Sequence, residues 1–327
     1  MVSSSGASKL VIVSPALREA NNGNWHTARR WAQFLSGQHE TALLDDWPGP
    51  GATPAGIMIA LHARRSAPAI QAWARQHPDK PLVLVLTGTD LYRDIQTDAD
   101  ARLSLALASQ LVVLQDNGLQ HLPPALRAKA CVIYQSARPL RPAHKPLRPF
   151  RAVMVGHLRD EKDPLTWLRA AAAPYTTPMR FEQIGAALQP ELALAAQAAQ
   201  QSIAGYRWPG NLPRAAARQH IKRAHVLVNS SLMEGGAQVI IEAVQSGTAV
   251  LASAVSGNIG MLGADYEGYF PAGDHAALAA LLQRCATGPA LLARLEQQCR
   301  ARAPLFSPDL EKRLVINLVN RALKASP

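Results

Sequence analysis

The sequence predicts an α/β protein of two doubly wound, Rossmann-like domains that face each other across a cleft. Three observations predict this fold. Short apolar runs alternate with helical segments, one proline-rich stretch interrupts the alternation, and 327 residues with 48% hydrophobic content suffice for two cores. Because ligands of open α/β sheets bind beyond the carboxyl ends of the strands, the cleft is the expected binding site.

The first half of the chain alternates strand and helix. Its continuous runs of Val, Ile and Leu indicate strands buried on both faces, as in a parallel sheet covered by helices. The expected strands are 10–13, 56–61, 82–87, 111–114 and 131–134, and the expected helices are 24–36, 67–76 and 100–109. We assign residues 1–148 to this domain.

Residues 135–149 separate the two halves. The segment contains four prolines, three arginines, a lysine and a histidine but no acidic residue. Proline lacks the backbone N–H that helices and central strands use, so neither element is expected to persist here. The segment is predicted to be an interdomain linker.

The same rhythm restarts after the linker and predicts a second domain, residues 149–304. The expected strands are 151–156, 179–185, 202–206, 225–230 and 248–253, and the expected helices are 164–172, 190–200, 212–222 and 239–244. Ser307 followed by Pro308 predicts a last helix, because Ser caps helices and Pro is favoured at the first helical position. We expect this helix, within residues 305–327, to cross back onto the first domain.

Composition limits the classes of function. No run of 18 apolar residues occurs, and the apolar stretch 10–13 ends at once in Ser14 and Pro15, so neither a spanning helix nor a secretory signal is predicted. The three cysteines are scattered without metal-ligand spacing, as is typical of a reducing cytoplasm. We expect a cytoplasmic protein without a membrane partner, and leave homo-oligomerisation open.

The net charge of +11 favours anionic ligands. Nucleic-acid binders tend to gather basic residues in stripes with aromatics between them, but aromatics make up only 5% of this chain and its arginines are spread widely. Small phosphorylated substrates are therefore expected, and a nucleic-acid partner is not. The alternative is a surface that is merely basic and soluble.

Two glutamates carry the most specific signal. Gly235 and Gly236 disfavour helix, so Glu234 is expected in a loop, whereas the apolar run 239–244 carries Glu242 on the following helix. At a rise of ~1.5 Å per residue the two carboxylates would lie up to roughly 12 Å apart, which suits the hexose and the ribose of one nucleotide sugar. Free N–H groups at the helix start would bind the phosphate between them. Alternatively, Glu234 caps a helix and Glu242 faces solvent.

A basic loop follows the strand expected at 151–156. It presents His157, Arg159 and Lys162 toward the cleft. A departing nucleoside diphosphate gains charge as the glycosidic bond breaks, and fixed cations stabilise that transition state without a metal. The alternative is that these side chains are solvated loop charges.

The first domain offers a glycine turn and a cluster of cations. Gly23 and Asn24 stand where the first helix begins, and a glycine there lets the backbone approach a phosphate or sugar closely. His62, Arg64 and Arg65 follow the strand that ends near residue 61, and Arg has the bidentate geometry that oxyanions require. We therefore expect an anionic second substrate there. A plain turn and a solvated helix cap are the alternatives.

Acidic residues follow the strand expected at 82–87. Gly88 permits a tight turn, and Asp90 can accept hydrogen bonds from sugar hydroxyls or orient a neighbouring arginine. Asp98 and Asp100 form an Asp-x-Asp that a divalent metal could use, but they serve equally well as the cap and the first-turn charge of the next helix. We expect no metal site.

Together, GHLRDEKDP (156–164) and EGGAQVIIE (234–242) resemble the donor half of the family 4 glycosyltransferases of GT-B fold. The resemblance covers nearly the whole chain. It implies two Rossmann-like domains, a sugar nucleotide as co-substrate, and no cofactor.

The resemblance also implies roles for single residues. It places Glu234 beside the donor hexose, Glu242 on the ribose hydroxyls and Lys162 on the pyrophosphate. The family's usual arginine, five positions before that lysine, is His157 here, so Arg159 is expected to substitute for it. The other donor contacts fall to Ser230, Gly235, Gly236 and Ala237.

Three further segments, NNGNWHTARRW (21–31), ALHARRSA (60–67) and TGTDLYRD (87–94), resemble more narrowly the selenosugar synthases of bacterial selenoneine biosynthesis, a branch of this group. That resemblance implies transfer of a hexosyl group from UDP-N-acetylglucosamine or UDP-glucose to selenophosphate, giving a 1-selenosugar. Selenophosphate is an anion and a strong nucleophile, so its site needs cations more than a general base. The acceptor residues would be Gly23, Asn24, His62, Arg64, Arg65, Thr89 and Asp90.

Several functions remain as alternatives. A family 4 glycosyltransferase with a hydroxyl acceptor shares the donor motif, and a UDP-sugar epimerase can share the fold but needs acid and base residues at the sugar. Outside enzymes, a nucleotide-sugar sensor or a two-lobed solute-binding protein would have the same outline.

Overall fold

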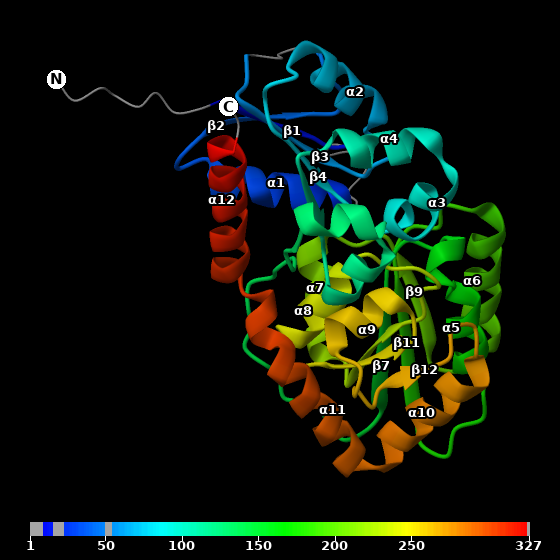
Figure 1. Cartoon of the computed structure of the whole chain (residues 1–327). Coiled ribbons are helices and arrows are strands. Elements are labelled where there is room, and N and C mark those ends of the chain that lie inside the picture. Colours follow the sequence, from blue (N-terminus) through cyan, green and yellow to red (C-terminus); the bar gives the residue numbers. More distant parts are fainter. Residues whose placement is uncertain (1–8, 16–22, 50–53, 326–327) are drawn as a thin grey trace. The chain divides into compact units, whose positions relative to one another are not determined.

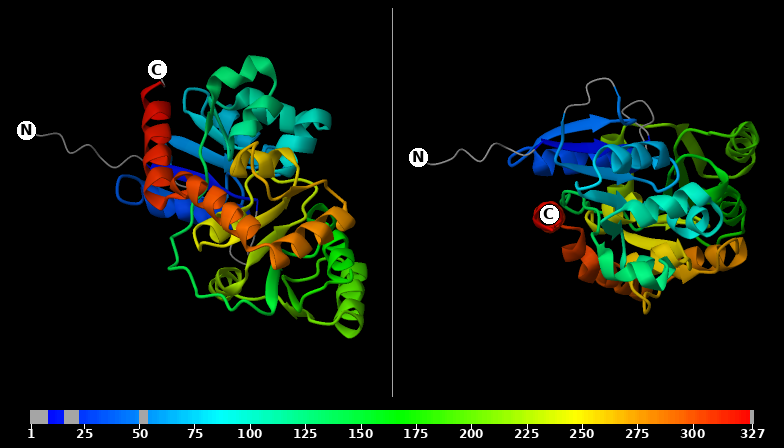
Figure 2. Two further views of the ribbon diagram at one scale, coloured as in Figure 1. Left: turned by 90° about the horizontal axis from the view of Figure 1, so that it is seen from below. Right: turned by 45° about the horizontal axis from the view of Figure 1, so that its top comes forward.

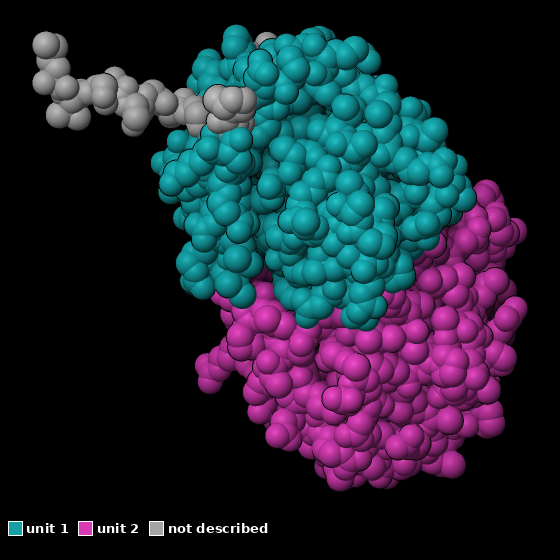
Figure 3. Space-filling model, viewed as in Figure 1, with its two compact units in different colours: residues 1–135, 308–327 teal, residues 136–307 magenta. Residues whose placement is uncertain are grey.

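A computed structural model of the protein describes residues 9–15, 23–49 and 54–325. The chain divides into two compact units, coloured separately in Figure 3. Unit 1 comprises residues 1–135 and 308–327, and unit 2 comprises residues 136–307. Within the described residues, each unit is built on one six-stranded parallel sheet.

Unit 1 alternates strands and helices (Figure 1). Its strands are β1 (Lys9–Val13), β2 (Glu40–Leu44), β3 (Ile57–Leu61), β4 (Leu82–Val85), β5 (Gln110–Val113) and β6 (Ala130–Val132). Its α-helices are α1 (Gly23–Leu35), α2 (Ala67–Gln76), α3 (Ile95–Thr97), α4 (Ala99–Leu107) and α12 (Pro308–Lys324). The strand order is β2-β1-β3-β4-β5-β6, so the sheet grows in opposite directions from β1 and β3.

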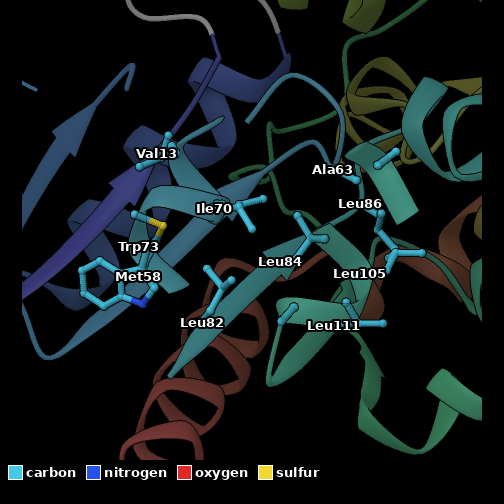
Figure 4. Packing of buried hydrophobic residues seen from close by; sticks show 14 of the residues in the cluster. Val13, Met58, Ala63, Ile70, Trp73, Leu82, Leu84, Leu86, Leu105 and Leu111 are labelled. Carbon is cyan, nitrogen blue, oxygen red and sulfur yellow. The ribbon is translucent and has the colours of Figure 1, made fainter. Parts of the chain in front are cut away.

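Both faces of this sheet are buried under helices. Successive side chains of a strand point to opposite faces, so each strand contributes to two cores. Leu10 and Ile12 join a core with side chains of α1 and α12, whereas Val11 and Val13 join a second core with side chains of α2 and α4 (Figure 4). The uninterrupted apolar runs of the sequence follow from this double covering.

Helix α12 belongs to unit 1 although it ends the chain. It lies against α1, as both views of Figure 2 agree, and Glu311 anchors it. The fully buried Glu311 carboxylate accepts hydrogen bonds from Nε and Nη2 of Arg30, at 2.8 and 3.0 Å, and from Nε1 of Trp31 at 2.8 Å. A bidentate guanidinium is the geometry in which a buried carboxylate is best compensated.

Unit 2 repeats the alternation. Its strands are β7 (Phe150–Val155), β8 (Met179–Ile184), β9 (Tyr206–Gly210), β10 (Val226–Asn229), β11 (Ala249–Ser253) and β12 (Tyr269–Phe270). Its helices are α5 (Pro164–Ala171), α6 (Pro190–Ser202), α7 (Arg214–Arg223), α8 (Gln238–Val244), α9 (Ser256–Leu262), α10 (His275–Thr287) and α11 (Pro289–Arg302). The order β12-β11-β10-β7-β8-β9 is that of a Rossmann sheet, with its reversal between β7 and β10.

The structure corrects the strand expected at 202–206. Helix α6 continues to Ser202, a turn follows in which Gly205 has φ +80°, and β9 begins only at Tyr206. The sequence of β9, YRWPG, lacks the apolar run that marks the other strands because Tyr206 is its one buried residue and the rest of this edge strand is exposed or half-buried. Strand β2 was missed for the same reason, and helices α9, α10 and α11 were not predicted.

Residues 136–149 contain neither helix nor strand. The segment follows the surface of unit 2 through separate hydrogen bonds. The amide of Leu140 donates to the carbonyl of Gln245 at 2.8 Å, and Nζ of Lys145 donates to the carbonyl of Gly247 at 3.1 Å. The proline-rich sequence thus satisfies its polar groups outside any regular element.

Candidate functional site

The candidate donor site lies where the strand order of unit 2 reverses. β7 and β10 are parallel neighbours, so their carboxyl ends lie at the same edge of the sheet. The chain leaves β7 into residues 156–163 and leaves β10 into residues 230–237. Ligands of doubly wound sheets bind at such a reversal. The two loops that carry most of the predicted donor residues are therefore neighbours.

Glu234 and Lys162 form an ion pair between these loops. Lys162 ends a short 3₁₀ turn, and its Nζ donates to Oε1 of Glu234. The hydroxyl of Ser231 donates to the same oxygen at 2.6 Å, and the amide nitrogen of Asn229 at 3.4 Å. Oε2 of Glu234 receives no hydrogen bond from the described residues and is not sealed from solvent. This second oxygen is available to a ligand.

The environment keeps Glu234 ionised. Burial alone would raise the pKa of this carboxyl, because a low-dielectric surrounding disfavours charge. The charge of Lys162 and the hydrogen bonds from Lys162, Ser231 and Asn229 outweigh burial and hold the pKa below its usual value of 4.5. A protein carboxylate that is ionised and buried is a strong acceptor for a ligand hydroxyl.

The two loops are bound to each other through their backbones. The hydroxyl of the fully buried Ser230 lies 2.9 Å from the carbonyl oxygen of Lys162 and 3.0 Å from that of Asp163, and it donates to them. The amide of Leu232 donates to the carbonyl of Glu161 at 2.9 Å. Ser230, predicted as a donor contact, therefore uses its hydroxyl to fix the turn that carries Lys162.

The segment 235–237 packs under the start of α9. The amide of Ala237 donates to Sδ of Met261 at 3.1 Å, so this N–H is already satisfied by the protein. A Cβ atom at Gly257 would lie 1.7 Å from the carbonyl oxygen of Glu234. Only glycine allows the two backbones to approach this closely. The position of the Glu234 loop therefore depends on Gly257.

Glu242 lies on α8, as predicted, but it does not face solvent. Its residue is 3% exposed, and Nε of Arg214, the first residue of α7, donates to its Oε1 at 2.6 Å. Arg218 lies near the same carboxylate: burial lowers the pKa of this arginine and the charge of Glu242 opposes that shift. Glu242 is thus a buried, paired carboxylate at the edge of the candidate donor site.

His157 and Arg159 occupy the loop after β7 without contacting Glu234. Nδ1 of His157 accepts a hydrogen bond from the amide of Ala186 at 3.3 Å. Burial, and then the charges of Arg159 and Lys162, lower the pKa of His157, so this ring is neutral at pH 7. The Arg159 side chain is 40% exposed, and its ion-pair partner among the described residues is Glu161, at 3.8 Å. Of these two residues, Arg159 is the one that carries charge.

The edge of unit 1 holds the predicted acceptor residues. His62 follows β3 with φ +73°, a conformation that non-glycine residues rarely adopt and that is often found at functional sites. Its Nδ1 accepts from the amide of Arg65 at 3.3 Å, so Nε2 carries the proton and donates to Oγ1 of Thr89 at 3.0 Å. Burial is the largest cause that lowers the pKa of His62. His62 and Thr89 are therefore brought together as a neutral pair.

Asp90, predicted to accept from sugar hydroxyls or to orient an arginine, binds backbone amides of unit 1. Its buried carboxylate accepts hydrogen bonds from the backbone amides of Ala63, Thr87 and Gly88, at 2.9, 2.9 and 2.8 Å. Asp90 thereby fixes the two turns that follow β3 and β4. Among the described residues, the carboxylate that accepts a hydrogen bond from Arg64 is that of Asp94.

Gly23 and Asn24 stand at the first turn of α1, and the hydroxyl of Thr27 donates to the carbonyl of Gly23 at 2.8 Å. A Cβ atom at Gly23 would meet nothing within 4 Å, so the backbone is open at this point. The rest of the predicted loop, residues 16–22, lies outside the described residues.

Sequence reasoning missed the partners that hold the site residues. The ion-pair partner of Glu242 is a helix residue with no motif around it, and the glycine beneath Glu234 lies in a segment for which no element was predicted. Only knowledge of which loops and helices become neighbours in the fold could have indicated these partner residues. The missed residues are Asn229, Ser231, Arg214, Gly257, Met261, Arg93 and Asp94.

Comparison with known protein families identifies the family of this chain. Residues 139–302, just over half of the chain, match the family of glycosyl transferases group 1. The chain belongs to that family. The match covers both loops of the candidate donor site. Among curated protein sequences, none matches this glycosyltransferase significantly.

Solved structures show that the glycosyltransferase has the GT-B fold, two Rossmann-like α/β domains with parallel sheets. Sucrose-phosphate synthase from Thermosynechococcus elongatus has a TM-score of 0.79 at 17% identity, covering 98% of this chain and 100% of that one. A glycosyltransferase from Rickettsia africae has 0.75 at 14%, covering 98% and 100%. HepE of Anabaena, in complex with UDP and glucose, has 0.72 at 15%, covering 96% and 100%.

Asp98 caps helix α4 of the glycosyltransferase, as the alternative interpretation of Asp98 and Asp100 expected. Its Oδ1 accepts from the amide of Ala101 at 2.8 Å, and Oδ1 of Asp100 accepts from Gln71 at 3.0 Å. Among the described residues, no group of three or more His, Cys, Asp and Glu side chains is placed to hold a metal ion.

No single helix in the described ranges has the length and apolar composition needed to cross a membrane. Residues 275–287 and 289–324 pass that test only when they are joined, and they are bent by 105° at the break between them.

Proposed function

We propose that this glycosyltransferase transfers a hexosyl group from a UDP-sugar, UDP-N-acetylglucosamine or UDP-glucose, to selenophosphate, and so forms a 1-selenosugar for selenoneine biosynthesis. Unit 2 binds the donor and unit 1 contributes the residues that contact the acceptor. The observation that carries the donor half is the geometry of Glu234. One carboxylate oxygen is saturated by Lys162, Ser231 and Asn229, and the other is available to a sugar hydroxyl.

The charges of unit 2 suit a nucleotide sugar. Lys162 keeps two further N–H donors beyond its bond to Glu234, and Arg159 is half-exposed beside it, so both can meet a diphosphate. Glu242, buried and ionically paired with Arg214, is placed on the helix after Glu234 and would accept from ribose hydroxyls. HepE, a structural neighbour, binds UDP and glucose, which supports a UDP-sugar as donor.

The proposed reaction is a displacement at the anomeric carbon. A selenium lone pair forms the new bond to this carbon while the bond to the UDP oxygen breaks and its electron pair leaves on the diphosphate. Lys162 and Arg159 stabilise the charge that develops there. Water then replaces selenium on phosphorus, which releases phosphate and leaves the 1-selenosugar. Selenium needs no strong base, because selenophosphate is already an anionic nucleophile.

The acceptor half rests on the segments that resemble selenosugar synthases and on the cations they carry. Arg64 and Arg65 are exposed at the end of β3, beside the strained His62. An oxyanion acceptor fits such a set better than an uncharged alcohol does, because Arg offers paired donors and a full charge.

Mass spectrometry tests the proposal. The protein is incubated with UDP-N-acetylglucosamine or UDP-glucose and with selenophosphate, and the products are searched for the selenium isotope pattern together with stoichiometric UDP. Reactions without acceptor and with the Glu234→Gln variant are the controls. Release of UDP only with a hydroxyl acceptor would make the protein an ordinary family 4 glycosyltransferase. Conversion of the donor to an isomer of equal mass, without release of UDP, would make the protein an epimerase.

A further inference from the structure

A cluster of cations in unit 1 surrounds one buried carboxylate. Strands β3 and β4 are parallel neighbours, so the turn after β3 and the π-helical turn Asp90–Asp94 after β4 start from the same edge of the sheet. Asp94 ends the second turn, and its side chain is 5% exposed. Among the described residues, Asp94 is the carboxylate of this edge that accepts from arginine side chains, whereas Asp90 accepts from backbone amides and the Thr87 hydroxyl.

Asp94 accepts hydrogen bonds from two guanidinium groups, each through its Nε atom. Its Oδ2 accepts from Nε of Arg64 at 3.0 Å, and its Oδ1 accepts from Nε of Arg93 at 3.1 Å. Both arginine side chains are about half exposed, at 43% and 48%. Their terminal nitrogens have no partner among the described residues. Each arginine is therefore oriented at its inner nitrogen, and its two outer nitrogens remain available to a ligand.

The charges around Asp94 do not cancel. Two guanidinium groups share one carboxylate, and Arg65 adds a further exposed cation from the same turn. Nε2 of His62 lies 3.9 Å from Oδ2 of Asp94, but it donates to Thr89 and the ring is buried. The excess positive charge therefore lies on arginine side chains. Two arginines can donate hydrogen bonds to the oxygens of one oxyanion from two directions.

We propose that Asp94 is a positioning residue that presents Arg64 and Arg93 as a two-guanidinium clamp for a tetrahedral oxyanion. The proposal rests on the proposed function in one respect, that the anion bound during turnover is the phosphoryl group of the acceptor. It adds Arg93, which lies in the segment 87–94 but is not among the predicted acceptor residues, as a direct contact of the anion. Arg64 supplies the second pair of N–H donors.

Inorganic phosphate and thiophosphate are the probes, and calorimetry with the unliganded full-length protein gives the affinity. Arg93→Gln should weaken phosphate binding about tenfold or more, the loss expected for a charged hydrogen bond of about 1.5–3 kcal/mol. Arg102→Gln, an exposed arginine on α4, is the matched control and should change nothing. UDP affinity should be the same in both variants. Equal weakening by the two variants would overturn the clamp, because charge alone would then account for binding.

Asp94→Asn separates positioning from charge. Removing a negative charge beside an anion site should tighten phosphate binding if Asp94 acts only through its charge. If Asp94 orients the guanidinium groups, phosphate binding should weaken in spite of the more positive site. Tighter or unchanged binding would refute the positioning role. Arg93→Gln, at an exposed side chain, keeps the proposal testable even if Asp94→Asn does not fold.

Kinetics distinguishes this inference from the proposed function. Arg93→Gln should raise KM for selenophosphate and leave KM for the UDP-sugar unchanged. If phosphate binding depends on Arg93 but no selenium-containing product forms, the clamp stands and the selenium acceptor is wrong. If the selenosugar forms and Arg93→Gln leaves both KM for selenophosphate and phosphate affinity unchanged, the acceptor is right and the clamp is wrong.

Discussion

Lys162 is the main group that stabilises Glu234 as an anion, together with the hydrogen bonds from Ser231 and Asn229. Burial and the lysine charge act on its pKa in opposite directions, and the lysine with its accompanying hydrogen bonds prevails. Because the pKa is lowered on folding, the pair contributes stability above the usual carboxyl pKa of 4.5. That contribution is lost as the pH falls through the lowered value.

Lys162→Met should reverse this pH dependence. Without the cation, burial raises the pKa of Glu234, so the variant should lose stability as the pH rises through the raised value. At pH 7 the loss should be about 3 kcal/mol, as for a buried pair that loses one member, and it should be smaller near pH 4.5. Urea denaturation at both pH values measures it. Lys9→Met, in an exposed pair with Glu40 at 3.5 Å, should cost less than about 1 kcal/mol. Equal losses at both pH values for Lys162→Met would contradict the argument.

Glu242→Ala should mainly weaken UDP-sugar binding. The carboxylate is 3% exposed and already oriented by Arg214, so its bonds to ribose hydroxyls would be charge-assisted. Their loss should lower affinity at least tenfold, corresponding to about 1.5–3 kcal/mol. Calorimetry with UDP gives the measurement, and Glu182→Ala, a half-exposed carboxylate paired with His220, is the control. An unchanged affinity would exclude the ribose role.

At the scale of single residues, the sequence could identify chemistry but not partners. It selected both Glu234 and Glu242, and the structure buries both of them. It offered Asp90 either for sugar hydroxyls or for a neighbouring arginine, whereas the carboxylate that accepts from Arg64 is that of Asp94. The two aspartates lie in one short segment, and only the π-helical turn decides which carboxylate meets Arg64.

The helices and strands of this protein could be predicted from the sequence where other parts of the chain bury them. Helix α8 was predicted at 239–244 and is found at Gln238–Val244, because its apolar run is buried on unit 2. The strand expected at 202–206 was wrong because an exposed edge strand has no such run. Patterns of burial are legible in a sequence only where a strand or helix is covered.

The start of α9 controls the loop that carries Glu234. Gly257→Ala would place a Cβ atom 1.7 Å from the carbonyl oxygen of Glu234, so one of the two backbones must move. We expect UDP-sugar turnover to fall at least tenfold, with a loss of about 1–3 kcal/mol in the free energy of unfolding. Steady-state kinetics and urea denaturation measure both effects. Gly37→Ala, where a Cβ atom meets nothing within 4 Å, is the control. Normal turnover in Gly257→Ala would show that the loop tolerates displacement.

At the scale of the whole molecule, each unit carries one of the two proposed ligand edges. The candidate donor loops belong to unit 2, and the turns after β3 and β4 belong to unit 1. A net charge of +11 favours anions at both edges, so charge by itself does not distinguish UDP from phosphate. The local geometry of each edge must do so.

Hydrogen exchange should locate the two ligands separately. UDP at about 100 times its Kd stabilises the state that binds it by about 2.7 kcal/mol, which slows exchange in the segments that it orders. We expect UDP to protect amides in 157–162 and 231–237, and inorganic phosphate to protect amides in 62–65 and 89–94. UDP protection confined to unit 1 would contradict the assignment of the donor to unit 2.

The sequence by itself determined the alternation of strands and helices, the parallel sheets and the glutamate motif, because continuous apolar runs and glycines act locally. The tertiary structure alone decided which charges meet: Arg214 with Glu242, and Arg64 and Arg93 with Asp94. Most of these contacts join segments that are adjacent only through strand order and register. Packing, rather than any sequence motif, sets the order of the strands. The sequence therefore contains no local signal for which of these charged residues will pair.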